Sequence, residues 1–338
     1  MKHQADALII GFGKAGKTLA PFLAKQGLKV IVVERCLVQN QPGVTVITGK
    51  ASFVSAHLVK IETEQGSMLV EAGRIFITTG SVPVIPVIPD IQSSKVYTSA
   101  ELLDLATLPE RLAIIGGGYI GLEFASIFAG FGTEVMILEQ GERFLPREDR
   151  DIAAEVQKVL EHKGIRIQLQ TGVTHIEDHR ETGLTLQLSS ANGLEESKAD
   201  AVLIATGRKA NTDELNLEAA GINRTARGFI QVDEKLQTNQ PHIWALGDVN
   251  GGPQFTYISL DDYRIVRDQW TGSGQRTTLD RKLVPYSVFI DPPLSHVGLT
   301  ESEALKQGYH VKVALIIRNR FNTGSPAEAD RGPSESCR

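Results

Sequence analysis

The sequence predicts an α/β fold with two Rossmann-like dinucleotide-binding domains. Two glycine patterns indicate this fold, because Gly11–Gly16 (GFGKAG) and Gly116–Gly121 (GGGYIG) each follow a short apolar run. In both copies a glutamate, Glu34 or Glu139, comes 18 residues after the last glycine. A single G-x-G-x-x-G pattern is weak evidence, but two copies with the same spacing to an acid predict two bound dinucleotides.

The spacing within each copy has a chemical reason. The first glycine makes the turn from strand to helix, the second lets a pyrophosphate approach the backbone, and the third lets helix and strand pack closely. The pyrophosphate then lies on free N–H groups at the positive end of the helix, and the acid at the end of the next strand hydrogen-bonds a ribose hydroxyl. The strands expected around the loops are Ala7–Ile10, Lys29–Glu34, Leu112–Ile115 and Glu134–Glu139.

The first copy also matches a rival pattern. Gly11–Thr18 reads GFGKAGKT, which fits the G-x-x-x-x-G-K-[ST] phosphate loop of NTPases. The second copy decides between the two interpretations, because Gly121 is followed by Leu122 and Glu123 rather than by lysine and a hydroxyl residue. A phosphate loop would also leave Glu34 without a role. We therefore favour the dinucleotide interpretation for both copies.

Composition narrows the classes of function. A chain of 338 residues is long enough for two or three domains. Its 35 basic and 40 acidic residues give a net charge of −5 without a basic block, which argues against nucleic-acid and anionic-membrane partners. No apolar run approaches membrane-spanning length and no signal peptide is visible, so we expect a soluble cytoplasmic protein.

Cysteine and histidine usage also bears on function. Cys36 and Cys337, the two cysteines of the chain, provide no disulfide framework. His175 and His179 have i, i+4 spacing, but they lie in a strand-rich segment and no third ligand follows them, so we expect no metal site.

Between and after the two loops, the remaining elements are predicted from periodicity and from turn residues. Each nucleotide-binding segment later reaches an apolar strand that ends in Thr-Gly, a strand end at which backbone can approach a nucleotide. The other expected features, in chain order, are the strand Ile75–Gly80, an extended connector at Ser81–Pro89, a helix within Glu148–Gly164, a strand-rich insert at Ile165–Ala201, the strand Val202–Gly207, a helix at Ile258–Trp270, new strands from Val284, a short helix at Thr300–Gln307, a further apolar strand at Val311–Ile317 and a disordered tail from Arg318.

Several longer stretches resemble one enzyme family. GFGKAGKTLA, GGGYIGLEFA, FLPREDRDIA and GDVNGGPQFTYISLDDYRIVRD occur in the order typical of the class I pyridine nucleotide-disulfide oxidoreductases, which include lipoamide dehydrogenase, glutathione reductase and mercuric reductase. They are most similar to the reactive-chlorine-resistance flavoprotein branch of bacteria. The resemblance covers about Ala5 to Ala314, with one gap.

The resemblance implies a domain organisation. The family has an FAD domain that is split by an inserted NAD(P)H domain, both three-layer β/β/α domains, followed by an α+β dimerisation domain, which is truncated here. The implied divisions are 1–98 and 211–282 for the FAD domain, 99–210 for the NAD(H) domain, 283–317 for the dimerisation domain and 318–338 for the tail. The family assembles as a homodimer, and the truncated interface makes heterogeneous association the expectation for this chain.

The resemblance also assigns site residues. Asp248 matches the aspartate that binds the flavin ribityl chain, and the backbone of Ala51 matches the adenine contact. Tyr119 stands where the family has a tyrosine that gates the nicotinamide pocket, and Glu123 where it has a glutamate near the flavin. The full FAD set is Gly11, Gly13, Gly16, Glu34, Ala51, Thr79, Gly80, Ser81, Gly247, Asp248, Gln254, Phe255, Thr256 and Tyr257, and the NAD set is Gly116, Gly118, Tyr119, Gly121, Glu123, Glu139, Val173 and Gly207.

The redox centre of the family is missing from the sequence. The family places C-x4-C after the second strand, whereas this chain passes from Glu34 to Gly43 directly, and roughly 60 residues are absent, including the lysine that would pair with Glu123. The C-terminal half of the dimerisation domain, with its His-Glu acid/base pair, is absent too. Cys36 lies two residues past the strand-end acid rather than about ten as in the single-cysteine relatives, so a catalytic role for it is not expected. No catalytic set is intact.

These residues support two hypotheses of different class. The first is an FAD-dependent NADH oxidoreductase that passes electrons to a small-molecule acceptor without a redox disulfide. NADH is expected over NADPH, because Glu139 is followed by Gln140 and Gly141, and no adjacent arginine would receive a 2′-phosphate. The second is a non-catalytic remnant that binds nucleotide without turnover. A single-cysteine NADH oxidase, or a metal-ion or disulfide reductase, is the remaining alternative.

Overall fold

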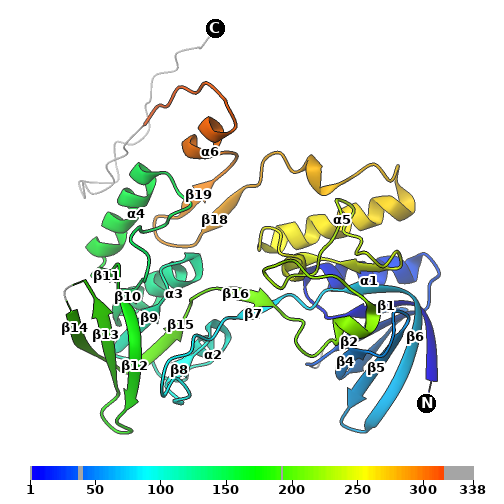
Figure 1. Cartoon of the computed structure of the whole chain (residues 1–338), viewed down its shortest axis with the longest axis horizontal. Coiled ribbons are helices and arrows are strands. Elements are labelled where there is room, and N and C mark those ends of the chain that lie inside the picture. Colours follow the sequence, from blue (N-terminus) through cyan, green and yellow to red (C-terminus); the bar gives the residue numbers. More distant parts are fainter. Residues whose placement is uncertain (1, 37–40, 192, 316–338) are drawn as a thin grey trace, which may run out of the picture. The chain divides into compact units, whose positions relative to one another are not determined.

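The computed structural model describes residues 2–36, 41–191 and 193–315. The chain comprises two compact units, Met1–Gly298 and Leu299–Arg338. Among the described residues, no helix is long and apolar enough to cross a membrane. The first unit holds two parallel-stranded sheets, each with its own glycine loop (Figure 1). The predicted α/β class is therefore confirmed.

A seven-stranded sheet carries the first loop. Its strands β3, β2, β1, β6 and β17 run parallel, and an antiparallel pair, β5 and β4, extends it beyond β6. Strand β17 comes after all strands of the second sheet in the sequence. The first sheet is therefore built from residues that precede the second sheet in the chain and from residues that follow it. The bounds are β1 Lys2–Ile10, β2 Val30–Glu34, β3 Val44–Thr48, β4 Lys50–Phe53, β5 Leu58–Thr63, β6 Gly66–Ile77 and β17 Ile243–Ala245.

Alternation along β1 assigns the two faces of this sheet. Ala7 and Ile9 are buried with helices α1 (Lys14–Lys25) and α5 (Thr256–Thr271). Leu8 and Ile10 are buried in a second cluster that includes side chains of β4, β5 and the 3-10 helix Leu217–Ala220. Because the side chains of a strand point alternately to opposite faces, a four-residue apolar run serves both layers of core.

The second sheet has five parallel strands in the order β11-β10-β9-β15-β8. One face is buried with helices α3 and α4, and the other is buried with a three-stranded antiparallel sheet, so this part has helix, sheet and sheet layers. The predicted strand-rich insert supplies β11 and the antiparallel layer. The bounds are β8 Val96–Tyr97, α2 Ser99–Leu103, β9 Arg111–Ile115, α3 Tyr119–Gly130, β10 Glu134–Leu138, α4 Arg150–His162, β11 Arg166–Gln168, β12 Gly172–Asp178, β13 Leu184–Ser190, β14 Gly193–Ala199 and β15 Ala201–Ile204.

Two paired segments connect the sheets. β7 (Ser81–Pro83) leaves the first sheet, and β16 (Arg208–Ala210) follows the last strand of the second. They pair antiparallel, with Ser81 opposite Ala210. The pairing brings residues that follow the two Thr-Gly strand ends next to each other.

A small hairpin follows α5 and the 3-10 helix Thr278–Asp280. Its strands, β18 (Tyr286–Val288) and β19 (Leu294–His296), pair antiparallel. Val288 and Leu294 are buried in the same apolar cluster as α3 and α4. The first part of the segment predicted as a dimerisation domain therefore packs on the second nucleotide-binding layer.

The second unit contains helix α6 (Glu301–Lys306), which Thr300 caps by accepting a hydrogen bond from the Glu303 N–H. The further strand predicted from Val311 is wrong for the described residues 311–315, which form neither strand nor helix. A strand needs a neighbour for its backbone groups, and no described strand pairs with this segment. Ile316, Ile317 and the predicted tail lie outside the described residues.

Candidate dinucleotide-binding sites

The first glycine loop has the geometry of a tight strand-to-helix turn. Gly11 has φ of +101°, and a Cβ there would lie 2.5 Å from the Thr78 carbonyl oxygen. A Cβ on Gly16 would lie 2.6 Å from the Gly11 carbonyl oxygen. Gly13 caps α1 at its N-terminus, so the first N–H groups of the helix face the loop. Gly11 and Gly16 are thus required for different steric reasons.

Glu34 is tied to this loop. Its Oε2 accepts a hydrogen bond of 2.6 Å from the Phe12 N–H, and its Oε1 accepts one of 2.7 Å from the Arg35 N–H.

The geometry of this loop also decides against the rival phosphate-loop pattern. The helix already begins at Lys14, and the Lys17 N–H donates to the Gly13 carbonyl inside it. No loop wraps a phosphate ahead of Lys17, so the dinucleotide interpretation fits.

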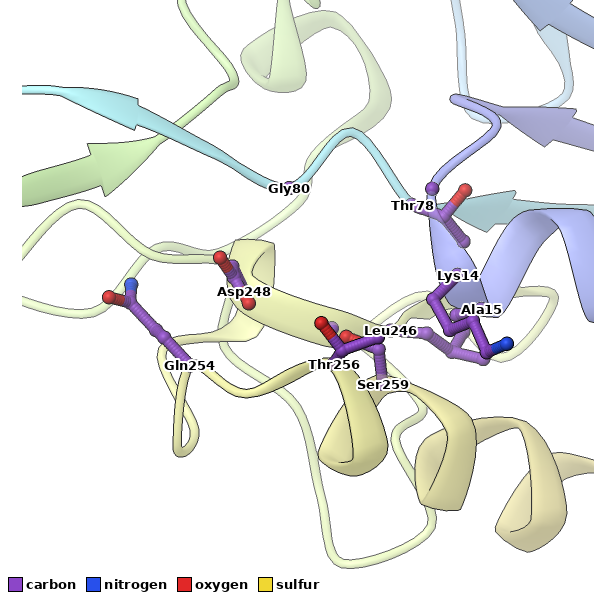
Figure 2. Close-up of a pocket in the computed structure, with 11 residues that line it drawn as sticks. Lys14, Ala15, Thr78, Gly80, Leu246, Asp248, Gln254, Thr256 and Ser259 are labelled. Atoms are coloured by element: carbon purple, nitrogen blue, oxygen red, sulfur yellow. The ribbon is translucent and has the colours of Figure 1, made fainter. Parts of the chain in front are cut away.

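A cavity of about 230 Å³ opens beside the N-terminus of α1 (Figure 2). Four separate segments of the chain converge on it. Lys14 and Ala15 lie toward one end of the view, and Asp248 and Gln254 lie toward the other. Of the predicted FAD residues it is lined by Gly13, Gly80, Gly247, Asp248, Gln254 and Thr256, together with Lys14, Ala15, Thr78, Leu246 and Ser259, which sequence reasoning missed.

Asp248 is held by a side chain that the sequence also predicted. The Ser81 hydroxyl donates to Asp248 Oδ2 at 2.7 Å. The same hydroxyl accepts from Nε of Arg208 at 2.7 Å, and Arg208 Nη2 donates to the Ser81 carbonyl at 2.6 Å. Arg208 was missed from the sequence, although a cation directly after the second Thr-Gly is the signal for it. The β7–β16 pairing therefore positions the cavity carboxylate.

Asp262 supports the same turn from the core. Its side chain is 1% exposed, and Oδ2 accepts hydrogen bonds from the Gly247 N–H at 2.6 Å and from the Asn250 amide at 3.2 Å. Burial raises the pKa of Asp262, and the ion pair with Arg281 opposes that rise. An acid on the buried face of α5 was the missed signal in the sequence.

The residues around the cavity fit a dinucleotide. Thr79, between the cavity-lining residues Thr78 and Gly80, has a buried Oγ1 without a hydrogen-bond partner among the described residues, and a polar ligand atom that reaches it would satisfy it. A Cβ on Gly13 would have no neighbour closer than 3.5 Å, which leaves the backbone open to a phosphate.

Two further residues considered in the sequence lie near the ends of strands in the first sheet. Ala51 lies in β4 and is buried. Cys36 is exposed and lies just past the Glu34 that ends β2.

The second glycine loop repeats the first. A Cβ on Gly116 would lie 2.4 Å from the Ala205 carbonyl oxygen, and one on Gly121 would lie 2.3 Å from the Gly116 carbonyl oxygen. Gly118 caps α3 and has no atom within 4 Å of its Cβ position. Glu139 accepts through Oε2 from the Gly117 N–H at 2.7 Å, as Glu34 does from Phe12, and through Oε1 from the Gly141 N–H.

The structure places Tyr119, expected at the nicotinamide pocket, and Glu123, expected near the flavin, one helical turn apart on α3. The Tyr119 hydroxyl donates to Glu148 Oε1 at 2.5 Å, and burial together with this carboxylate raises the pKa of Tyr119 to about 12. Glu123 accepts from the Phe289 N–H at 3.0 Å, so its carboxylate holds the end of β18.

The other predicted contact residues are Val173, Gly207, Phe255 and Tyr257. Val173 is buried in the core between the second sheet and the antiparallel layer, which leaves its backbone for any contact with nucleotide. Gly207 has open space around its Cβ position. Phe255 and Tyr257 stack at the start of α5, with ring centroids 5.4 Å apart. Among the described residues, no three His, Cys, Asp or Glu side chains gather as a metal site.

Two glycine loops, each with a bonded strand-end glutamate, define a protein that binds two dinucleotides. A family model described as pyridine nucleotide-disulphide oxidoreductase matches residues 35–262. The pyridine nucleotide-disulfide oxidoreductase RclA of Escherichia coli (strain K12) is 42% identical, over 93% of this chain and 81% of its own length. This chain belongs to the pyridine nucleotide-disulfide oxidoreductase family, and it is a flavoprotein oxidoreductase. Membership implies FAD and a pyridine nucleotide as cofactors.

Other relatives match a smaller share of their own length. Mercuric reductase of Staphylococcus aureus is 36% identical over 81% of this chain and 49% of its own length. Dihydrolipoyl dehydrogenase of Bacillus subtilis is 35% identical over 80% of this chain and 58% of its own length. The solved structure of the HOCl-induced flavoprotein disulfide reductase RclA from Escherichia coli is 43% identical, covers 90% of this chain and 79% of that one, and superposes with a TM-score of 0.82.

The alignment with RclA also indicates a gap. It extends over 364 positions, more than the 338 residues of this chain. RclA therefore carries residues inside the matched region that have no counterpart here.

Proposed function

We propose that this protein is an FAD-dependent NADH oxidoreductase that passes electrons to a small-molecule acceptor without a redox disulfide. The connection between β2 and β3 carries the proposal. These strands are parallel, and only residues 35–43 join them. Parallel neighbours usually need a crossover of a dozen or more residues, most often through a helix. The one cysteine in that connection is Cys36, two residues after Glu34, the acid expected to face the adenosine ribose.

In the proposal the first loop holds FAD. The N–H groups at Gly13 and the start of α1 face the pyrophosphate, and Glu34 faces the adenosine ribose. Asp248, fixed by Ser81 and Arg208, accepts from hydroxyls of the chain that leads to the flavin ring. When bound, FAD supplies the capacity to take a hydride and to give electrons singly, while the protein orients the ring.

We further propose that the second loop holds NADH rather than NADPH. The two carboxylate oxygens of Glu139 accept hydrogen bonds from the Gly117 and Gly141 N–H groups, which hold the carboxylate where the ribose would lie. A 2′-phosphate would be placed against this carboxylate, which is repulsive. Replacing Glu139 by Ala and Gln140 by Arg should relax the preference, and comparable kcat/KM for the two cofactors in the unmodified protein would refute it.

The domain division is part of the same proposal. β17 pairs directly with β6, although the strands of the second sheet lie between them in the sequence. This pairing supports an FAD domain made of 1–98 and 211–282 and an NAD(H) domain made of 99–210.

We propose that the family dimer forms poorly. Apolar side chains of the second unit are more than half exposed, at Leu305, Val313 and Leu315. Such a surface favours heterogeneous association.

The test is the visible spectrum of the purified protein before and after anaerobic addition of NADH. Bound flavin that bleaches supports the oxidoreductase. Flavin that stays oxidised, or a protein that retains no flavin after reconstitution with FAD, would instead support the non-catalytic remnant. Loss of bleaching or turnover in Cys36→Ser would favour the single-cysteine alternative.

A further inference from the structure

The buried carboxylate of Glu148 lies between Tyr119 and Tyr286, and neither Glu148 nor Tyr286 belongs to the set of residues that the family resemblance assigned. Glu148 is 5% exposed, and its Oε1 accepts from Tyr119 at 2.5 Å and from Tyr286 at 2.6 Å. The two hydroxyl oxygens are 3.3 Å apart. The three residues come from the start of α3, the segment before α4 and the hairpin strand β18. Because an unpaired buried carboxylate is costly, this cluster fixes three separate segments together.

Ring contacts link the cluster to residues beside the cavity at the N-terminus of α1. Tyr119 is the first residue of α3, directly after the glycine where a pyrophosphate would approach. Its ring stacks on that of Tyr286, and Tyr286 stacks on Phe255 with centroids 5.5 Å apart. The neighbours of Phe255 on both sides, Gln254 and Thr256, line the FAD cavity. A dinucleotide that extends from the second loop toward this cavity must pass the Tyr119 side chain.

We infer that Glu148 and Tyr286 are positioning residues that latch Tyr119 across the path of the nicotinamide ring. The inference rests on the proposed second nucleotide site. Entry of the nicotinamide breaks the hydrogen bond between Tyr119 and Glu148. Tyr286 stays bonded to the same oxygen, so the open state leaves the buried carboxylate with a partner. Two arrangements of one ring around a shared acceptor therefore make a two-state gate.

The shared acceptor predicts opposite effects for the two tyrosines. Tyr119→Phe keeps the ring and removes the latch, so a ligand with a nicotinamide ring should bind about tenfold more tightly. Glu148→Gln keeps a neutral acceptor and should change affinity in the same direction by less, since hydrogen bonds to charged groups are the stronger ones. Tyr286→Phe removes the rival donor and the open-state partner, so binding should weaken by about three- to tenfold.

The experiment measures binding of NAD⁺ and of adenosine diphosphoribose to the FAD-loaded protein by titration calorimetry. Adenosine diphosphoribose occupies the second loop but lacks the nicotinamide, so the latch does not oppose it. NAD⁺ affinity should rise in Tyr119→Phe and fall in Tyr286→Phe, while the affinity for adenosine diphosphoribose stays unchanged in both. Tyr263→Phe, whose ring packs on Phe22 in the first core, serves as the matched control and should change neither.

The outcomes separate the latch from the proposed function. Parallel losses for both ligands in all variants would show that the cluster only supports the fold, and would overturn the latch. Unchanged NAD⁺ affinity in Tyr119→Phe and Tyr286→Phe would overturn it too, with the nucleotide site intact. Failure of the unmodified protein to bind either ligand would refute the second nucleotide site itself, and the latch with it. If Glu148→Gln does not fold, the two phenylalanine variants still decide the question.

Discussion

The two nucleotide-binding halves share one loop geometry and differ in the strand connection beyond it. Glu34 and Glu139 each accept from the N–H of the residue after the first glycine, at 2.6 and 2.7 Å. Beyond the acid, β10 reaches its parallel neighbour β11 through helix α4, whereas β2 reaches β3 through residues 35–43 alone. The geometry of the glycine turn thus depends on local residues, the glycines and the strand-end acid. It is the same in the half where the following connection, between β2 and β3, is short.

The difference extends to the sheet faces. Helix α4 buries Ala153, Val156 and Leu160, which cover β11 and its neighbours. No described helix lies between β2 and β3, and Val44 and Val46 of β3 stay only partly buried. The first half therefore depends more on contacts from distant segments, above all those of α5 and β17. We therefore expect the first half, which we propose binds FAD and call the FAD half, to be disrupted more easily than the second, the proposed NAD half.

The largest expected effect is at Asp262, which supports the FAD half from the core. Asp262→Ala removes the acceptor of the Gly247 N–H and leaves Arg281 with Asp261 alone. Breaking a buried ion pair costs about 3–5 kcal/mol, so the urea midpoint should fall sharply and FAD should be lost. Asp178→Ala, which breaks a partly exposed ion pair with Lys95 in the other half, is the comparison variant. Equal destabilisation by the two would contradict the asymmetry.

The glycine loops should fail independently. Gly11→Ala and Gly116→Ala each force a Cβ to within 2.5 Å of a carbonyl oxygen at positive φ, where alanine is also strained by about 1–2 kcal/mol. Gly11→Ala should lose FAD, and Gly116→Ala should keep FAD and lose NADH binding. Gly27→Ala, at positive φ with no neighbour within 4 Å, controls for strain alone. Loss of both cofactors in Gly116→Ala would show that the halves are coupled.

A smaller effect is expected at the cavity carboxylate. Asp248→Ala removes a charged acceptor worth about 1.5–3 kcal/mol, so FAD affinity should fall about ten- to a hundredfold while the fold persists. Cys36→Ser should leave flavin content and NADH turnover unchanged, since the exposed thiol lies at the Glu34 end. Fluorescence titration of the apoprotein with FAD measures the flavin affinity of both variants. Flavin loss in Cys36→Ser with none in Asp248→Ala would reverse the assignment.

The smallest effect concerns alkaline stability of the NAD half. The pKa of Tyr119 is raised from 10 to about 12 by burial and by Glu148. The unfolded chain loses this proton first, so the stabilisation is complete below pH 10 and is lost as the pH rises through about 12. Tyr119→Phe should flatten the fall of the unfolding midpoint in this window. An unchanged alkaline slope in the variant would show that Tyr119 does not titrate late.

The sequence predicted the parts that depend on local patterns. Glycine spacing, the apolar runs before the two loops and helical periodicity before Gly164 anticipated the two loops, the parallel strands beside them and α4, because each is a local consequence of sterics and burial. Arg208 and Asp262 were missed, since their partners lie 127 and 15 residues away and only folding brings them together. The strand expected from Val311 failed because an apolar stretch does not by itself supply a pairing partner.

The proposal that this protein works without a redox disulfide is tested most directly by counting reducing equivalents. The FAD-loaded protein is titrated anaerobically with NADH under an enzymatic NAD⁺-removing system, and thiols are counted before and after in denaturant. We predict that one equivalent of NADH per flavin completes the reduction and that the thiol count does not change. Uptake of a second equivalent with two new thiols per flavin would contradict the account, because it would require a disulfide that exchanges electrons with the flavin.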